Sequence, residues 1–331
     1  MKTIYIVTGA NGFLGNVVVR KLIEEKKTVR CLVLKGDRLK SLEGLDCEIF
    51  YGDTTNKESL KEIFDVKDKL IVIHCAGIVS IVSKFDQRVF DVNVMGTKNV
   101  VDMCIEKKVE KLIHVSSVHA IPEVVNKGLI KEVNHFDKTL VEGLYAKTKA
   151  EASAYVMAKI NEGLNAVIVH PSGIIGPYDF GDSHLTKMIE DCARGKLTAA
   201  VHGGYDFVDV RDVANGIILA ANNKSSRGCY ILSNKYFEVI DILNITSKVL
   251  NKKGIKTILP MWFARFTAPL SELYYRILKQ TPLYTKYSLF TLYANGNFDN
   301  SKAKKELGYT NRDINETIKD TLDWLKTQNR I

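Results

Sequence analysis

Short, nearly continuous hydrophobic runs alternate with helical patterns through the first half of this sequence. Between the runs, apolar residues such as Phe13, Val17 and Leu22 recur at helical spacing. Strands that are hydrophobic on both faces and separated by helices are typical of a parallel sheet covered on both sides. The fold class that this pattern predicts is α/β, with a doubly wound parallel sheet. The runs are Ile4–Val7, Val29–Leu34, Glu48–Tyr51, Leu70–His74, Leu112–Val115 and Ala166–Val169.

The second half is less regular, and no linker separates it from the first. Helical patterns cover residues 212–221, 237–250 and 314–325, and a strand pattern covers 229–233. We therefore expect a dinucleotide-binding domain over residues 1–170. Residues 171–331 should form mainly a smaller substrate-binding lobe, with some elements returning to the core of the first domain.

Composition narrows the function classes. The 331 residues are 46% hydrophobic and 26% charged, and the net charge of +9 is spread along the chain without a nucleic-acid motif. No apolar run approaches the roughly 18 residues of a membrane-spanning helix. The N-terminus shows no signal-peptide pattern, and the six cysteines form no C-x-x-C pair or metal-ligand cluster. We expect a cytoplasmic protein with reduced thiols, no metal and no nucleic-acid partner.

A glycine-spaced loop, Thr8-Gly9-Ala10-Asn11-Gly12-Phe13-Leu14-Gly15, lies between the first predicted strand and the first helix. Glycines at every third position allow a tight turn and a close approach of backbone N–H groups to a pyrophosphate, beside the positive end of a helix. This placement predicts a dinucleotide site, although glycines also mark ordinary turns. The residues expected at the cofactor are Gly9, Asn11, Gly12, Phe13, Leu14 and Gly15.

Two further strand ends fit the same pocket. Asp53 and Thr54 follow the third strand, where a carboxylate can accept a hydrogen bond from an adenine amino group. Cys75, Ala76 and Gly77 follow the fourth strand, where small residues let a cofactor cross the sheet edge. For Asp53, the alternative is a helix N-cap before residues 54–64.

The end of the second strand bears on the choice between NAD and NADP. An acidic residue that binds the ribose of NAD is expected there, but Leu34 holds the position, with Lys35 and Arg38 after it. Basic groups suit a 2′-phosphate, so we predict NADP, with NAD as the alternative because Asp37 is near and the basic side chains could simply be solvated.

Tyr145 and Lys149 stand four residues apart in a helical pattern and share one face. A phenol has an ordinary pKa of about 10, too high for proton transfer near neutrality. A neighbouring ammonium and an oxidised nicotinamide would lower it. A serine at the end of the fifth strand, Ser116 or Ser117, could hold the substrate oxygen beside the phenol. The alternative is a tyrosine–lysine contact on an exposed helix.

Together these motifs make the sequence resemble the extended short-chain dehydrogenase/reductases, the NAD-dependent epimerase/dehydratase family, over nearly the whole chain. The resemblance rests on T-G-A-N-G-F-L-G (8–15), G-D (52–53), H-C-A-G (74–77), N-V-M-G-T (93–97), V-S-S (115–117), Y-A-K-T-K (145–149), H-P-S-G-I-I-G-P (170–177), F-V-D-V-R-D-V-A (207–214) and N-F-D-N-S-K-A-K-K-E-L-G-Y (297–309).

The resemblance implies a Rossmann fold and an NAD(P)-dependent enzyme that acts on CH–OH groups. Ser117, the second serine of the pair, Tyr145 and Lys149 would be its catalytic residues. Asn93 would support them, a role that overlaps with a buried amide fixing a helix bend. Proteins similar to this one commonly form homodimers.

By the same resemblance, Pro171 and Ile174 would lie along the nicotinamide, and Arg211 or Asp212 would help to join the two lobes. His119 and His170 lie near the expected site, where lone histidines are more often structural than catalytic.

Residues 117–123 distinguish branches of this family. They lack the Thr-Asp-Glu run of sugar-nucleotide dehydratases and the V-Y-G of epimerases, and are more similar to dihydroflavonol reductases, cinnamoyl-CoA reductases and 3β-hydroxysteroid dehydrogenases. We expect reduction of a ketone or aldehyde on a small apolar substrate, or oxidation of the matching alcohol. The alternatives are a sugar-nucleotide epimerase with tightly bound NAD and a non-catalytic sensor of the dinucleotide.

Aromatic residues crowd the segment from 262 to 293. They could line a hydrophobic pocket or a lid, or form the core of the smaller lobe, and the basic residues among them would allow a weak peripheral membrane contact. The segment holds Trp262, Phe263, Phe266, Tyr274, Tyr275, Tyr284, Tyr287, Phe290 and Tyr293.

Overall fold

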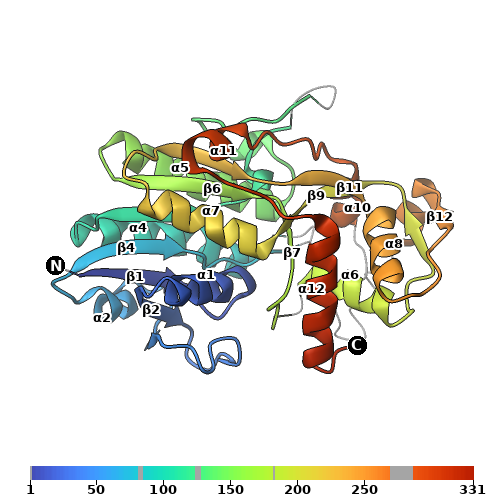
Figure 1. The fold of residues 1–331 in the computed structure, drawn as a ribbon. Coiled ribbons are helices and arrows are strands. Elements are labelled where there is room, and N and C mark those ends of the chain that lie inside the picture. The colour runs from blue at the N-terminus through green and yellow to red at the C-terminus, as the bar shows by residue number, and fades with distance from the viewer. Residues whose placement is uncertain (1, 81–84, 124–127, 182, 269–285) are drawn as a thin grey trace.

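The computed structural model describes residues 2–80, 85–123, 128–181, 183–268 and 286–331. Seven parallel strands form the main sheet, in the order β10-β6-β5-β4-β1-β2-β3 (Figure 1). The prediction of a doubly wound parallel sheet is confirmed. The strands are β1 (Thr3–Thr8), β2 (Thr28–Val33), β3 (Glu48–Tyr51), β4 (Lys69–His74), β5 (Lys111–Val115), β6 (Ala166–Pro171) and β10 (Gly228–Leu232).

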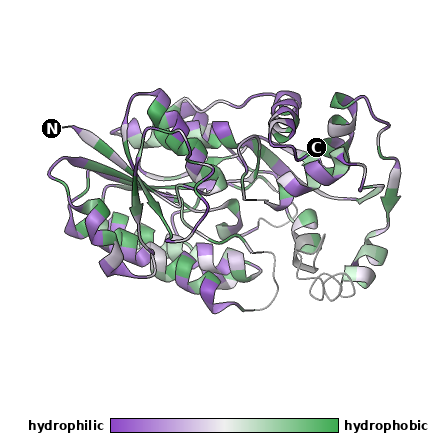
Figure 2. Cartoon of the chain, turned by 90° about the horizontal axis from the view of Figure 1, so that it is seen from below, coloured by the Kyte–Doolittle hydropathy of each residue, from purple (hydrophilic) through white to green (hydrophobic). Residues whose placement is uncertain are grey.

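Alternate residues of every strand except the mostly exposed edge strand β3 contribute to two hydrophobic cores. On one face, Val7 and Ile73 pack with α1 (Phe13–Glu24) and α7 (Val210–Asn222). On the other, Ile6 and Val72 pack with α4 (Gly96–Glu106), α5 (Leu144–Asn161) and the short α2 (Lys61–Phe64). In Figure 2 the strands of the sheet are mostly hydrophobic, whereas the helices carry both hydrophobic and hydrophilic residues. Burial on both faces explains the unbroken hydrophobic runs of the sequence.

The rest of the chain builds two small sheets with helices around them. One has the order β11-β9-β7, and the other pairs β12 with β8. Phe207 and Trp324 belong to one core, which β7, β9, α6, α8 and α12 share, whereas α11 packs into the core of the main sheet. The elements are β7 (Gly173–Ile175), α6 (His184–Ala193), β8 (Ala199–Val201), β9 (Gly204–Asp209), β11 (Lys235–Glu238), α8 (Val239–Val249), β12 (Thr257–Leu259), α10 (Lys286–Tyr293), α11 (Ser301–Leu307) and α12 (Ile314–Thr327).

The predicted helix at 237–250 begins later than expected. Residues 235–238 are strand β11, which pairs with β9, and α8 starts at Val239. Glu238 has an extended backbone and is both the last residue of β11 and the N-cap of α8. Its side chain forms a capping box with Asp241, so the helix begins at the next residue. β10, predicted at 229–233, pairs with β6 in the main sheet. The division at residue 170 into two domains stays a prediction.

Among the described residues, no helix has both the length and the apolarity to cross a bilayer. The carboxyl ends of β1, β4, β5 and β6 lie at one edge of the main sheet, because the four strands are parallel and adjacent. Ligands of open parallel sheets bind at this edge.

Candidate active site

The glycine loop leaves no room for a side chain at its first and third glycines. Gly9 has φ +63°, and a Cβ there would lie 2.8 Å from backbone atoms of Ala76. A Cβ on Gly15 would lie 2.1 Å from the carbonyl oxygen of Gly9, so the third glycine lets α1 pack against the loop. Gly12 is the N-cap of α1, and no side chain caps this helix end. The N–H groups of its first turn, which begins with Phe13 and Leu14, are therefore available to an anion such as a pyrophosphate.

The loop after β2 lies beside the glycine loop. Asn11 donates a hydrogen bond from Nδ2 to the Asp37 carboxylate at 2.9 Å, so the structure brings a carboxylate to the ribose side of the expected pocket. Leu34, Lys35 and Arg38 are exposed. The two basic side chains are thus accessible to a phosphate, in competition with the Asp37 carboxylate.

The ends of β3 and β4 complete the edge. Asp53 Oδ1 accepts from the Thr55 N–H at 2.8 Å, and the N-cap of the following helical turn is Asn56, not Asp53. The N-cap alternative for Asp53 is therefore wrong. Thr54 is buried, and a Cβ added to Gly96 at the start of α4 would lie 2.6 Å from its Oγ1.

Cys75, Ala76 and Gly77 lead from β4 towards α5. The Ala76 N–H donates to Thr8 Oγ1 at 3.2 Å, which fixes this segment to the end of β1. A Cβ on Gly77 would lie 3.2 Å from the Lys149 ammonium nitrogen. The segment after β4 therefore meets α5 at Gly77.

Tyr145 and Lys149 lie in the first two turns of α5, and both are buried. The Tyr145 hydroxyl interacts with the Ser117 side chain, at the end of β5. Lys149 Nζ donates to the Val115 carbonyl oxygen at 2.9 Å. Both residues of the helix thus point at the end of the same strand, so the alternative of an exposed tyrosine–lysine contact is wrong.

The two neighbouring serines have different partners. Ser116 Oγ lies 2.7 Å from Ser153 Oγ in a buried contact between β5 and α5. Ser117 contacts Tyr145 and accepts from the His119 N–H at 3.2 Å. Since only Ser117 touches the phenol, the geometry favours Ser117 as the site serine.

Asn93 lies in a π-helical turn, Asp91–Met95, just before α4. Its Oδ1 accepts from the Ile78 N–H at 2.8 Å, and its Nδ2 donates to the Ile78 carbonyl at 3.0 Å and to Thr148 Oγ1 at 3.1 Å. The amide therefore fixes the segment after Gly77 to α5. In this structure its side chain positions the site through its neighbours.

The electrostatics of the phenol differ from the sequence expectation. Burial raises the pKa of Tyr145 to about 12, although its interaction with Ser117 opposes the shift. Burial likewise lowers the pKa of Lys149 to about 8. The ammonium is directed to the Val115 carbonyl and does not offset the desolvation of the phenol, so the expected lowering of the tyrosine pKa is absent in the cofactor-free chain.

Two histidines, the buried His170 and the partly buried His119, touch the site. His170 Nδ1 lies 2.9 Å from the Ser117 carbonyl oxygen, and the His119 ring meets the Tyr145 ring edge-on at 6.1 Å. Burial lowers the pKa of each to about 4, so both rings are neutral at neutral pH. Their contacts hold Ser117 and Tyr145 in place, which agrees with the structural role favoured from the sequence.

Pro171 ends β6, and Ile174 lies in β7, where it pairs with Val208 of β9. The segment between them is anchored by Ser172, whose hydroxyl donates to Asp206 at 2.5 Å. This segment leads from the carboxyl edge of the main sheet to the first small sheet. It is therefore placed to line one side of a ligand at that edge.

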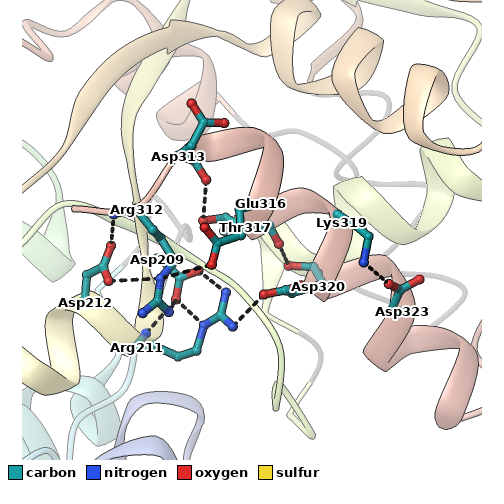
Figure 3. Close-up of polar contacts among 11 residues, drawn as sticks. Asp209, Arg211, Asp212, Arg312, Asp313, Glu316, Thr317, Lys319, Asp320 and Asp323 are labelled. Atoms are coloured by element: carbon teal, nitrogen blue, oxygen red, sulfur yellow. Dashed lines mark hydrogen bonds and ion pairs between the residues drawn. The ribbon is translucent and has the colours of Figure 1, made fainter.

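Figure 3 shows the ion-pair network at the junction of β9, α7 and α12. Asp209 is buried and pairs with Arg211 at 2.7 Å and with Arg312 at 3.4 Å. Arg211 also reaches Asp320 at 2.7 Å, and Arg312 reaches Asp212 at 3.3 Å. Arg211 and Asp212 thus both tie α7 to α12. The sequence analysis missed Asp209 and Arg312.

The aromatic side chains of the segment from 262 to 293 are not packed in a core where the structure describes them. Trp262, Phe263 and Phe266 are exposed, so the core interpretation is wrong for these three. Tyr274, Tyr275 and Tyr284 lie outside the described residues, as does the side chain of Tyr287.

A family model described as the NAD dependent epimerase/dehydratase family matches residues 5–232. The chain belongs to this family. Sterol demethylase protein B of Methylococcus capsulatus is 29% identical over 98% of this chain and 99% of its own length. A putative dihydroflavonol 4-reductase of Synechocystis is 28% identical over 98% and 95%. The 3β-hydroxysteroid-dehydrogenase/decarboxylase isoform 1 of Arabidopsis thaliana is 32% identical over 84% of this chain and 67% of that protein.

Among solved structures, the crystal structure of gox2253 superposes with a TM-score of 0.85, at 30% identity and 99% coverage of both chains. UDP-glucose 4-epimerase of Thermotoga maritima reaches a TM-score of 0.75 at 20% identity, which shows a shared fold alone. The predictions of the family and of a dehydrogenase or reductase are confirmed by these matches, and the family's cofactor is a nicotinamide dinucleotide.

Proposed function

We propose that this protein reduces a ketone or aldehyde on a small apolar substrate, or oxidises the matching alcohol, by Ser-Tyr-Lys chemistry. The observation that carries the proposal is the buried contact between the Tyr145 hydroxyl and Ser117, with Lys149 one turn further along α5. The glycine loop and the uncapped end of α1 fit a dinucleotide, because the first N–H groups of the helix have no side-chain acceptor and a Cβ at Gly9 or Gly15 would clash with neighbouring backbone and prevent the tight turn. Such a cofactor supplies or accepts the hydride.

In the reducing direction, the carbonyl carbon gains a hydride and the carbonyl oxygen must gain a proton. Tyr145 would donate its phenolic proton to that oxygen, and the Ser117 hydroxyl would hold the oxygen by a hydrogen bond. The phenolate that remains would be stabilised by the Lys149 ammonium if this side chain turned from the Val115 carbonyl towards the phenol, and would regain its proton from solvent. The site therefore acts by proton donation and by stabilising developing negative charge.

The direction of the tyrosine pKa suits this role. A group whose pKa is raised to about 12 stays protonated through the neutral range, so Tyr145 enters the reaction as a proton donor. Oxidation of an alcohol needs the phenolate instead, and therefore a positive charge beside the ring.

The substrate class rests on the relatives. Their names describe proteins of sterol, steroid and flavonoid chemistry, whose substrates are largely apolar. The V-Y-G and Thr-Asp-Glu patterns of the sugar-nucleotide branches are missing after Ser117. An apolar carbonyl compound is the substrate class that both observations favour.

The test is consumption of NADPH with a panel of aromatic and steroidal ketones and aldehydes. Tyr145→Phe should lower kcat by at least about 100-fold, because positioned general acids contribute roughly 10²–10⁴-fold. Tyr155→Phe is the matched control, since Tyr155 lies on the same helix and bonds to Asp102. A loss of less than tenfold in Tyr145→Phe would refute the assigned donor.

Two other results would favour the alternatives. Copurified NAD without net cofactor consumption would favour an epimerase. Tight cofactor binding with no turnover on any carbonyl would favour a sensor. A pair of variants separates the serines: Ser117→Ala should lower kcat by about tenfold or more, whereas Ser116→Ala should act through stability.

For the cofactor we propose NADP(H), because Lys35 and Arg38 are exposed at the end of β2 and Leu34 stands where NAD enzymes carry an acid. The Lys35→Ala/Arg38→Ala double variant should weaken NADPH binding by at least about tenfold and leave NADH binding unchanged, since each charged contact contributes about 1.5–3 kcal/mol. Lys61→Ala is the control. Tighter binding of NADH than of NADPH by the unmodified protein would overturn this choice.

A further inference from the structure

One helix of this protein buries its small apolar side chains and exposes its large aromatic ones, the reverse of the usual arrangement. Residues 261–268 are helical, and their buried side chains are Ala264 and Ala268, which pack on α10. The large aromatic side chains of the same helix point outwards, with Trp262 70% exposed, Phe263 40% and Phe266 71%. We call these three residues the aromatic face. Large aromatic side chains are seldom left in water without a partner.

Basic residues lie immediately before this helix in the chain. Lys248, Lys252 and Lys256 line one open hollow at the end of α8, which we call the lysine hollow. Lys253 is exposed beside it. From residue 242 to 268 the sequence has five lysine and arginine residues and no aspartate or glutamate. All the charged residues of this stretch are therefore positive, whereas acidic and basic residues are mixed along most of the chain.

The lysine hollow and the aromatic face are close in space. Strand β12 begins directly after Lys256 and has only three residues, a span of roughly 10 Å. Its Ile258 is also exposed. The Arg265 guanidinium lies over the Tyr293 ring at 5.9 Å, so a cation also sits on the aromatic helix. Figure 1 shows α8, β12 and α10 together at the end of the molecule away from β1 and β2.

We propose that this end of the protein docks on the surface of an anionic lipid bilayer. Trp and Phe side chains enter the interface between headgroups and acyl chains, and lysine side chains attract anionic headgroups. A protein partner would have to match both features, whereas a bilayer supplies apolar depth and negative charge together. The inference does not depend on the proposed reaction, because none of these residues belongs to the catalytic site.

Vesicle sedimentation tests the proposal with the full chain. The protein should sediment with vesicles of equal parts phosphatidylglycerol and phosphatidylcholine, and much less with pure phosphatidylcholine. Raising the salt from about 0.1 M to about 0.5 M should release it, because screening weakens the lysine contribution. Absence of binding to the anionic vesicles would overturn the proposal.

Two double variants assign the binding to its residues. Trp262→Ala/Phe266→Ala should lower the vesicle partition coefficient by at least about tenfold, and so should Lys248→Glu/Lys256→Glu. All four side chains are exposed, so the fold should persist, and circular dichroism checks this.

Matched controls come from other surfaces. Tyr51→Ala/Leu140→Ala removes two exposed apolar side chains elsewhere. Lys67→Glu/Lys107→Glu reverses charge in a second lysine-lined hollow, which also contains Asp68 and Glu110. Both controls should bind as the unmodified protein does. Equal losses in the controls would overturn the assignment. So would an aromatic-face variant that binds vesicles normally but turns a dimer into a monomer, because the face would then belong to a protein interface.

Discussion

The buried charge of Lys149 lowers the free energy of unfolding by a measurable amount. Its ammonium is buried beside the site, and burial lowers its pKa from 10.5 to about 8. The gap of about 2.5 between the two values corresponds to about 3 kcal/mol at neutral pH. The Lys149→Met variant keeps a long, unbranched side chain and removes the charge, but it leaves the Val115 carbonyl without its partner, which costs about 1 kcal/mol. The variant should therefore be about 2 kcal/mol more stable at pH 7, and inactive.

The sign of the pH dependence makes this prediction specific. Between pH 8 and 10.5 the unfolded chain holds the lysine proton and the folded chain does not, so the stability of the unmodified protein rises with pH. Below pH 8 both states hold the proton and this group contributes no slope. The advantage of Lys149→Met should thus shrink from about 2 kcal/mol at pH 7 to nearly zero at pH 10.

Urea unfolding of the cofactor-free protein at pH 7 and pH 10 measures both values. Lys61→Met, on an exposed side chain, is the control and should stay within about 0.5 kcal/mol of the unmodified protein at each pH. The reasoning is refuted if Lys149→Met is the less stable protein at pH 7, or if its difference from the unmodified protein is the same at both pH values.

Three further predictions concern other parts of the structure. Gly15→Ala should abolish dinucleotide binding in a titration, because its Cβ would lie 2.1 Å from the Gly9 carbonyl, whereas Gly181→Ala, with its nearest neighbour at 3.7 Å, should bind normally. Asp209→Ala removes the buried carboxylate that Arg211 and Arg312 share and the N-cap of α7, although each arginine keeps a second acidic partner, and should cost about 2–4 kcal/mol in urea unfolding, against less than about 1 kcal/mol for Asp323→Ala, whose pairs are exposed. Burial raises the pKa of Asp206 from 3.8 to about 6, so between those pH values the folded chain keeps a proton that the unfolded chain has lost, and the stability of the protein falls as the pH rises. Asp206→Asn should lose this slope in urea unfolding. An unchanged slope would contradict the burial argument.

The strands of the main sheet other than the mostly exposed edge strand β3 were predictable because they are buried on both faces. The pattern Ile4–Val7 lies within β1, and 48–51 coincides with β3. Short strands such as β8 and β12 escaped notice, since three residues are too few to establish a periodicity. The helix predicted over 237–250 includes the end of β11, because the apolar pattern of α8 continues back through these residues and does not reveal that Glu238 is the helix N-cap.

Within the candidate site, the sequence identified residue types but not their environments. Ser116 and Ser117 are indistinguishable in sequence, and only the contact with Ser153 shows that Ser116 faces the packed interior. The tyrosine pKa was expected to fall because a lysine is near, but burial outweighs that charge. Arg312 could not be linked to Asp209, because more than a hundred residues separate them and no local pattern records the pairing.

The π-helical turn that holds Asn93 makes this stretch sensitive to its length. A π turn accommodates one residue more than an α turn, so a deletion within Asp91–Met95 would let the segment wind as ordinary helix. Everything on its N-terminal side, including α3 (Gln87–Phe90), would then rotate by about 100° relative to α4. Exchanging a side chain here alters one contact, whereas losing a residue shifts the register of the helix that supports the site.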